Sequence, residues 1–125
     1  LKLDSVTATS SPFGKMTLGY APPEQCRNLK GDIDSRADLF ATGVTMYECA
    51  TGINPFLNPP PRDPMEILKR VERDVLPPLL LPIRERDSFR DLISAMTQKD
   101  RVHRPGKVTL AFDWLRDIAR QEQII

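Results

Sequence analysis

The strongest constraint on the fold is the segment from Ser35 to Thr51, which is long, poor in charge and bounded by helix signals. Its apolar and small residues form one stripe at helical spacing: Leu39, Phe40, Gly43, Val44 and Tyr47. After Asp38 the segment carries a single charged residue, Glu48, and Gly52 follows it where a C-terminal cap belongs. Because such a helix must be covered on most sides, we predict a largely buried central helix.

Helix start signals predict three further helices. Asp63 can cap the first of them, with Pro64 at the first helical position and Glu66 completing a capping box. The apolar face of this helix comprises Leu68, Val71 and Val75, and Pro77-Pro78 is expected to end it. Ser88 with Asp91 begins the next helix, with Phe89, Leu92, Ile93 and Met96 on one face.

The last predicted helix follows Arg104-Pro105-Gly106. Its apolar face comprises Val108, Ala111, Phe112, Leu115, Ile118 and Ala119. Connections separate the helices at residues 53–62, which are rich in proline, and at residues 79–86, and turn and loop residues continue from Pro22-Pro23 to Gly31-Asp32. The expected fold class is therefore mainly α, with about four helices, long loops and almost no strand.

Composition narrows the possible functions. The chain has 18 basic and 17 acidic residues without a long run of one sign, so neither a nucleic acid partner nor a membrane surface is expected. Cys26 and Cys49 lack metal-ligand spacing and His103 is the single histidine, so we predict no metal site and two free thiols. The chain has no leader-like start and no membrane segment, which favours a cytoplasmic location. A first residue other than methionine suggests a piece of a longer protein.

Three motifs in a fixed order carry the functional signal: TLGYAPPEQ at residues 17–25, DLFATG at residues 38–43, and Arg104-Pro105. In this order and spacing they resemble the second half of the Ser/Thr protein kinase catalytic domain, in the form found in bacteria. The resemblance covers residues 2 to about 120. It implies a partial kinase domain, with the activation segment and substrate loop at residues 1–33 and the helical C-terminal lobe at residues 34–125.

The family resemblance assigns substrate binding to Thr17, Leu18, Gly19 and Tyr20. These residues resemble the loop that receives the substrate residue after the phosphorylated one. Thr17 stands where the family has a threonine that supports catalysis by bridging the catalytic aspartate and a lysine. An ordinary loop threonine is the alternative interpretation of Thr17.

Three other positions resemble structural residues of the family. Glu24 corresponds to a glutamate that forms a buried ion pair with the arginine of the downstream Arg-Pro, here Arg104. A planar guanidinium can bind a carboxylate through two hydrogen bonds, so the pair is physically reasonable, although two surface charges are the alternative. Asp38 and Gly43 fall in the Asp-x-Trp-x-x-Gly start of the central helix, with Phe40 in the tryptophan position. The aspartate would position the catalytic loop, or it would simply favour the positive helix N-terminus.

The first sixteen residues resemble an activation segment. Asp4-Ser5-Val6 aligns with the metal-binding Asp-Phe-Gly motif but lacks its phenylalanine and glycine, so Asp4 is a doubtful remnant of a metal ligand. Thr7, Thr9, Ser10 and Ser11 are candidate phosphorylation sites, since a phosphate could order the loop against arginines. A hydroxyl-rich loop without that role is the alternative.

The resemblance also identifies what the chain lacks. The sequence contains neither a G-x-G-x-x-G loop nor a His-Arg-Asp catalytic loop, both of which protein kinases use. We therefore expect a parent Ser/Thr kinase that uses ATP and magnesium on a protein substrate, and an isolated chain that binds neither and is inactive. Its partner would be the missing N-terminal half of the domain. A pseudokinase or a helical scaffold module is the alternative.

Overall fold

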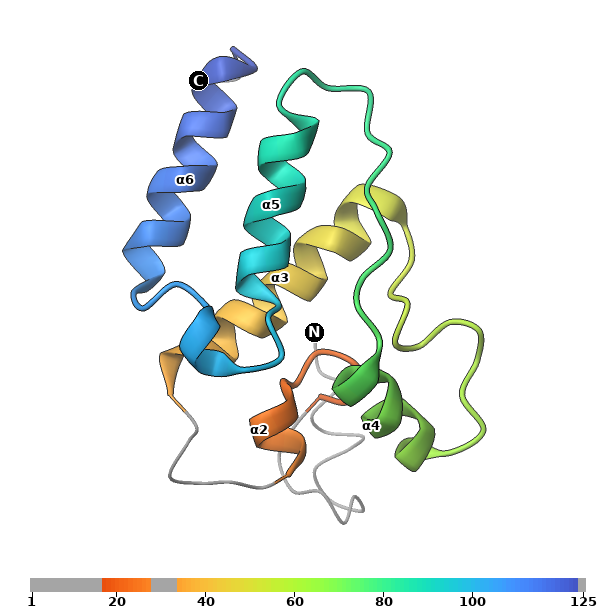
Figure 1. Cartoon of the computed structure of the whole chain (residues 1–125). Helices are drawn as coiled ribbons and strands as arrows, with labels where there is room; N and C mark the ends of the chain where they lie inside the picture. Colours follow the sequence, from red (N-terminus) through yellow and green to blue (C-terminus); the bar gives the residue numbers. More distant parts are fainter. Residues whose placement is uncertain (1–16, 28–33, 124–125) are drawn as a thin grey trace.

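The computed structural model describes residues 17–27 and 34–123. The described elements are α2 (Pro23–Cys26), α3 (Ser35–Thr51), α4 (Pro64–Arg73), α5 (Arg86–Met96), the 3₁₀ helix η2 (Arg101–His103) and α6 (Val108–Gln121). These residues contain no strand, and the four longer helices are those that the sequence predicts (Figure 1). The prediction of a mainly α fold is confirmed.

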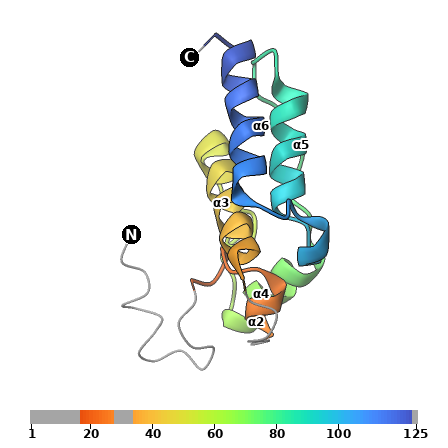
Figure 2. The same cartoon turned by 90° about the vertical axis from the view of Figure 1, so that its left-hand side faces the viewer.

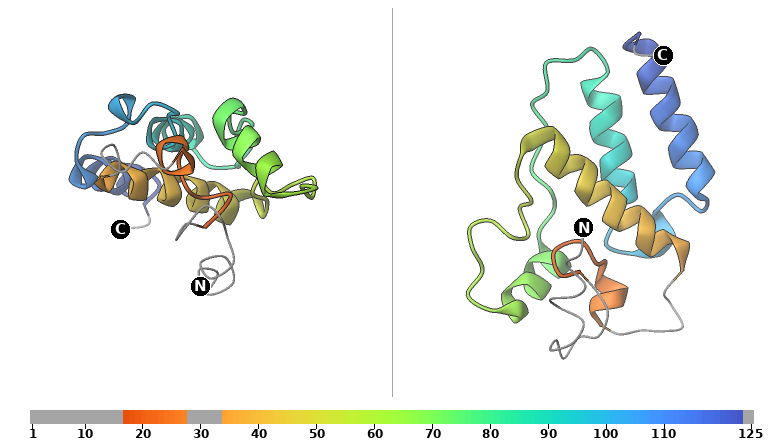
Figure 3. Two further views of the ribbon diagram at one scale, coloured as in Figure 1. Left: turned by 90° about the horizontal axis from the view of Figure 1, so that it is seen from below. Right: turned by 180° about the vertical axis from the view of Figure 1, so that it is seen from behind.

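Helices α3, α5 and α6 form two layers, and helices α2 and α4 lie together at one end of them. Helices α5 and α6 run antiparallel side by side, and α3 crosses them diagonally (Figures 1 and 2). Helices α2 and α4 lie at one end of this assembly, next to each other (Figure 3). Helix α5 packs on both α3 and α6, so it joins the two layers.

Local signals explain the bounds of α3. The Asp34 carboxylate accepts a hydrogen bond from the Arg36 backbone N–H at 2.9 Å and caps the N-terminus. Gly52 ends the helix with a φ of 81°, a left-handed conformation that glycine adopts without steric cost. The predicted stripe is buried, with Phe40 and Val44 fully inaccessible to solvent. The predicted stripe is therefore confirmed as buried, whereas Asp38, Thr42, Thr45 and Cys49 are exposed, so the helix is buried on one side rather than on most sides.

Helix α3 contributes to three hydrophobic clusters, the third through Tyr47, which packs with Leu79 and Ile93. The first joins it to α5 and α6 through Leu39, Leu92, Met96, Ala111 and Ile118. The second joins it to α4 and to the loop at residues 17–20; its buried members are Phe40, Val44, Phe56, Ile67 and Val71. Leu18 and Tyr20 pack against the second cluster, so the core itself supports the loop that sequence analysis assigned to substrate binding.

Gly43 lies where α3 packs against the C-terminal end of α5. A Cβ atom at this position would lie 2.7 Å from Cγ2 of Thr97 and 3.0 Å from Cβ of Met96. Both distances are shorter than ordinary van der Waals contact, so any larger residue would push the two helices apart. This contact gives Gly43 a packing role between the layers.

Three sequence-based details are wrong. Residues 23–26 form the short helix α2 where continuous turn and loop were expected. Helix α4 ends at Arg73 rather than at Pro77, because Asp74 is already extended, so Val75 leaves the predicted apolar face and is 79% exposed. Proline disfavours helical conformation in the residue before it, so Leu76 could not have carried the helix on to Pro77. Helix α5 starts at Arg86, two residues before the predicted Ser88.

The predicted apolar face of α6 is covered only in part. Ala111 and Ile118 are buried, whereas Phe112 is 60% exposed and Val108 is 37% exposed. Phe112 and Val108 border an apolar hollow of about 90 Å³ between α3, α5 and α6.

None of the described helices has the length and apolarity that crossing a membrane requires.

Candidate functional site

A buried ion pair connects α2, which follows the loop at residues 17–20, to the segment between α5 and α6. Arg104 Nη1 donates to Glu24 Oε2 at 2.6 Å, and Nη2 donates to Glu24 Oε1 at 2.9 Å. The two side chains are 0% and 5% exposed, so this is a two-pronged pair shielded from water. Glu24 belongs to α2 and Arg104 directly follows η2.

Arg104 uses its remaining N–H groups on backbone carbonyls. It donates to the carbonyls of Gln98, Arg36 and Lys99 at 2.8, 3.0 and 3.3 Å. Together with the two bonds to Glu24, all five guanidinium N–H groups therefore have an acceptor. The guanidinium also lies 5.1 Å from the centre of the buried Phe40 ring. Arg104 thus holds together α2, the first turn of α3 and the segment after α5.

The loop at residues 17–20, which the sequence predicts to bind substrate, is a tight turn fixed by contacts with the core. The Thr17 carbonyl accepts hydrogen bonds from the N–H groups of Tyr20 and Ala21 at 3.1 and 3.0 Å. Gly19 has a φ of +95°, and a Cβ there would lie 2.8 Å from Cδ2 of Leu57. The turn therefore requires glycine for both conformation and space.

Two side chains hold the loop in place: Glu48, near the end of α3, and Asn54, in the connection after α3. Asn54, which is 2% exposed, donates through Nδ2 to the Gly19 carbonyl at 3.1 Å. Its Oδ1 accepts from the Phe56 N–H at 2.9 Å, which orients the amide. The Tyr20 hydroxyl donates to Glu48 Oε1, and burial, followed by this bond, raises the pKa of Tyr20.

Thr17 and Asp38, two of the predicted site residues, carry polar groups that are free to bind another group. In the described part of the chain, the Thr17 hydroxyl has no hydrogen-bond partner, and the side chain is half-buried. Asp38 is exposed on the first turn of α3 and borders the apolar hollow next to α6. Neither side chain contacts the Glu24–Arg104 pair, so the structure does not bring all the predicted site residues together.

A second charged network was not predicted from the sequence. Asp34 Oδ2 lies 2.9 Å from Arg36 Nη2 and 2.5 Å from Arg101 Nη1. Hydrogen bonds from Arg36 lower the pKa of Asp34 to about 2. The Asp-Ser pair before an apolar periodic segment is a helix start signal that could have identified Asp34. Arg101 has no comparable local signal, because it reaches Asp34 only after η2 packs beside α3.

Two of the hollows in the described part of the chain do not fit an ATP–magnesium site. The described residues contain no group of three His, Cys, Asp or Glu side chains that could hold a metal ion. The polar crevice beside α2 has as many carboxylates as cations, since Glu24, Glu72 and Asp100 face Arg27, Lys99 and Arg101. The hollow beside α6 is apolar apart from Asp38 and Thr42. Neither offers the excess of positive charge that a triphosphate needs.

Several predicted residues lie outside the described ranges. Asp4, proposed as a remnant metal ligand, and the candidate phosphorylation sites Thr7, Thr9, Ser10 and Ser11 all belong to residues 1–16. The assignments to these positions stay predictions.

Comparison with characterised proteins identifies relatives of this chain. It is 36% identical over 104 residues to the serine/threonine-protein kinase RUNKEL of Arabidopsis thaliana, which covers 82% of this chain and 7% of that protein. It is 30% identical over 100 residues to a protein of Clostridium perfringens named "Probable serine/threonine-protein kinase", covering 80% and 14%. It is 37% identical over 75 residues to the kinase PknB of Mycobacterium leprae, covering 59% and 11%. No family model matches the chain, and no solved structure matches it.

These relatives and the helical fold define the class of protein. The chain is related to the Ser/Thr protein kinases of the bacterial type, and its described part is a helical unit of that family. It spans 7 to 14% of the length of these relatives.

Proposed function

We propose that this chain is the substrate-side helical lobe of a Ser/Thr protein kinase, which transfers the terminal phosphoryl group of ATP to Ser or Thr of a protein. In this proposal residues 1–33 are the activation segment with the substrate loop, and residues 34–125 are the helical lobe. The observation that carries it is the buried Glu24–Arg104 pair, because it fixes the end of the substrate loop to the helical core.

The environment of the loop supports this role. A loop that selects a protein substrate must keep its shape when the substrate binds, because positioning supplies much of the catalytic advantage in phosphoryl transfer. Asn54 and Glu48 bind the two ends of the Gly19-Tyr20 pair, and Leu57 packs against Gly19. Thr17 lies at the start of this fixed turn, and its hydroxyl is available for a group outside the described residues.

The apolar hollow beside α6 supports a second part of the proposal. Phe112 and Val108 are exposed there, and Asp38 adds a carboxylate at the rim. An exposed aromatic side chain next to a hollow is typical of a surface that another part of the protein covers. We infer that the half of the kinase domain that carries the catalytic loop packs on this surface, with Asp38 accepting its backbone N–H groups.

The nucleotide and magnesium belong to that other half in this proposal. The residues that would hold them are the Gly-rich loop, a lysine and the metal-binding carboxylates, none of which the described residues provide. The chain described here would supply the protein-substrate surface and the support for it. The 125-residue chain by itself is expected to bind no ATP–magnesium in calorimetric titrations and to transfer no phosphate.

Phosphoryl transfer by the longer protein tests the proposal. The longer protein is assayed with labelled ATP and a library of Ser/Thr peptides, as wild type and with Thr17→Val. The variant should lose at least tenfold in kcat, because Thr17 would support the catalytic residues. Thr45→Val is the matched control, since Thr45 is exposed and its hydroxyl bonds only within α3, to the Ala41 carbonyl at 2.9 Å. A folded longer protein without transferase activity would contradict the proposal and indicate a binding or scaffold role.

A further inference from the structure

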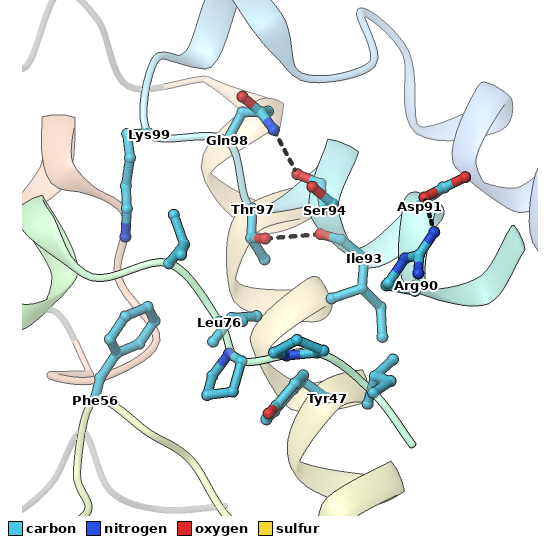
Figure 4. Close-up of a pocket in the computed structure, with 14 residues that line it drawn as sticks. Tyr47, Phe56, Leu76, Arg90, Asp91, Ile93, Ser94, Thr97, Gln98 and Lys99 are labelled. Carbon is cyan, nitrogen blue, oxygen red and sulfur yellow. Dashed lines mark hydrogen bonds and ion pairs between the residues drawn. The ribbon is translucent and has the colours of Figure 1, made fainter. Parts of the chain in front are cut away.

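The proposed function leaves one groove of the molecule unused. It has a volume of about 430 Å³ and lies between α5 and the extended connection that follows α4 (Figure 4). The connection carries an uninterrupted apolar run, residues 75–83, in which Val75 and Leu80 are 79% and 85% exposed. The groove therefore combines the size of a small-molecule site, which is roughly 300–1,000 Å³, with a mainly apolar wall.

The prolines of this wall restrict what can occupy the groove. Pro77 and Pro78 both line it. They have no N–H group to offer a neighbouring strand, so an extended peptide cannot form a continuous hydrogen-bond ladder along the wall. A small molecule with an apolar body needs no such ladder and therefore fits the wall better.

Tyr47 brings an unused polar group to the groove. Tyr47 is 5% exposed and packs with Leu79 and Ile93; Figure 4 shows Leu76 between Tyr47 and Phe56, and Leu76 packs with the clusters of both. The Tyr47 hydroxyl has no hydrogen-bond partner in the described part of the chain, where no buried side-chain oxygen lacks a partner, so this oxygen is reached from the groove. Burial raises the pKa of Tyr47, so the hydroxyl stays protonated at neutral pH and can donate a hydrogen bond to a ligand.

Two of the charges that line the groove compensate each other. Arg90 lies 3.3 Å from Asp91, and it lies 3.4 Å from Asp87 as well. Arg90 therefore gives the groove no net attraction for an anion. The remaining charged residue of the lining is Lys99.

Lys99 gives the groove a positive charge that no close carboxylate compensates. Its Nζ donates to the carbonyls of Val71, at 2.6 Å, and Asp74, and it lies 4.8 Å from the centre of the Phe56 ring; these contacts favour the ammonium form. No carboxylate of the described residues lies within ion-pair distance of this nitrogen, and those of Asp74 and Glu72 act on it from farther away. A single charge beside an apolar wall produces a positive potential, which favours an anionic ligand over a neutral or cationic one.

We propose that the groove binds a small monocarboxylate with an apolar body, such as a medium-chain fatty acid. The carboxylate accepts a hydrogen bond from the Tyr47 hydroxyl in the positive potential of Lys99, and the chain packs on the apolar wall. Binding involves no covalent step, and the inference does not depend on the kinase proposal. Because the ligand binds the folded chain, it should raise the melting temperature.

The test uses isothermal titration calorimetry on the full 125-residue chain, with its helical fold verified by circular dichroism. The probe is monomeric octanoate; 1-octanol and octylammonium have the same chain with a neutral and a positive headgroup, and acetate has the headgroup without the chain. Octanoate should bind about tenfold more tightly than 1-octanol, octylammonium should bind more weakly still, and acetate should give no measurable heat. Equal affinities for octanoate and 1-octanol, or no saturable binding of octanoate, would overturn the proposal. Tighter binding of a peptide that ends in leucine would assign the groove to a protein chain and overturn it as well.

Variants of two groove residues locate the binding. Tyr47→Phe should weaken octanoate binding by about tenfold and leave the melting temperature of the free chain nearly unchanged, because the hydroxyl has no partner in the part of the chain that the structure describes. Ser94 is exposed on α5 and lines the groove, so Ser94→Phe should block binding, whereas Ser94→Ala, the matched control, should bind as wild type does. Wild-type affinity in Tyr47→Phe would contradict the role of the hydroxyl, and wild-type affinity in Ser94→Phe would place octanoate elsewhere on the molecule. Either result overturns the proposal.

Discussion

Arg104 and Glu24 form a two-pronged ion pair across 80 positions of sequence, with both side chains almost completely buried. The pair joins α2, which follows the loop at residues 17–20, to the segment after α5. Because the pair is buried, removing one partner would leave the other charge without solvation by water, which is strongly destabilising.

Removing either partner should therefore be costly. Glu24→Gln and Arg104→Met should each lower the free energy of unfolding by about 3–5 kcal/mol, since the remaining charge is stranded. The double variant should lose clearly less than the sum of the two single losses. Urea unfolding monitored by circular dichroism gives all three values.

The exposed pair between Arg27 and Glu72 is the matched control for this cycle. It has comparable geometry, with Arg27 Nη2 2.7 Å from Glu72 Oε2, but the side chains are 52% and 32% exposed. Arg27→Met should therefore cost no more than about 1 kcal/mol. Additive losses in the Glu24–Arg104 cycle would show that the two residues act independently.

Gly43→Ala should destabilise the protein although alanine is the better helix former. The substitution gains up to about 1 kcal/mol of helix propensity. Overpacking against Thr97 and Met96 should cost about 1–3 kcal/mol, because these atoms cannot move without shifting α5. Adding Thr97→Ser removes the closest methyl group and should restore part of the loss. Thermal unfolding of these variants measures the effect. Gly106→Ala is the control, because a Cβ there meets no atom within 4 Å. A Gly43→Ala variant more stable than wild type would refute the prediction.

The two cysteines should differ in reactivity. Burial raises the pKa of Cys26 to about 11, and its thiol lies 3.7 Å from the Ala21 carbonyl oxygen, whereas Cys49 is exposed on α3. Because the thiolate is the reactive form, iodoacetamide at pH 8 should label Cys49 first and Cys26 much more slowly. Mass spectrometry of the labelled peptides follows both sites. Equal rates in the folded chain would mean that Cys26 is accessible and that α2 is not held on the core.

Asp34 should contribute a pH-dependent part of the stability. Its pKa is lowered from 3.8 to about 2 in the folded state, so its contribution is complete above pH 4 and is lost as the pH falls toward 2. The carboxylate is 37% exposed, which limits the contribution to about 1 kcal/mol. Asp34→Asn keeps a capping side chain and removes the charge, so it isolates the electrostatic part. The difference in unfolding free energy between wild type and Asp34→Asn should shrink from pH 6 to pH 2; a constant difference would exclude this linkage.

The sequence by itself determined the four longer helices and the mainly α fold. The reason is that these signals are local: Gly52 ends α3, Asp63 starts α4 with Pro64, and apolar spacing identifies each buried face. Such signals act within one or two turns of helix and do not depend on what packs against them. Motif resemblance also singled out Glu24 and Arg104, although spacing and composition could not have paired two residues so far apart.

Tertiary structure decided the rest of the site. The five acceptors of Arg104 come from three segments, and they meet only after α2 and η2 dock beside α3. At the end of α4, Lys99 binds the Val71 and Asp74 carbonyls from another part of the chain. The close approach of Gly43 to Thr97 likewise exists only in the packed layers. These features cannot be predicted from local sequence patterns, because they depend on how segments far apart in the sequence pack together.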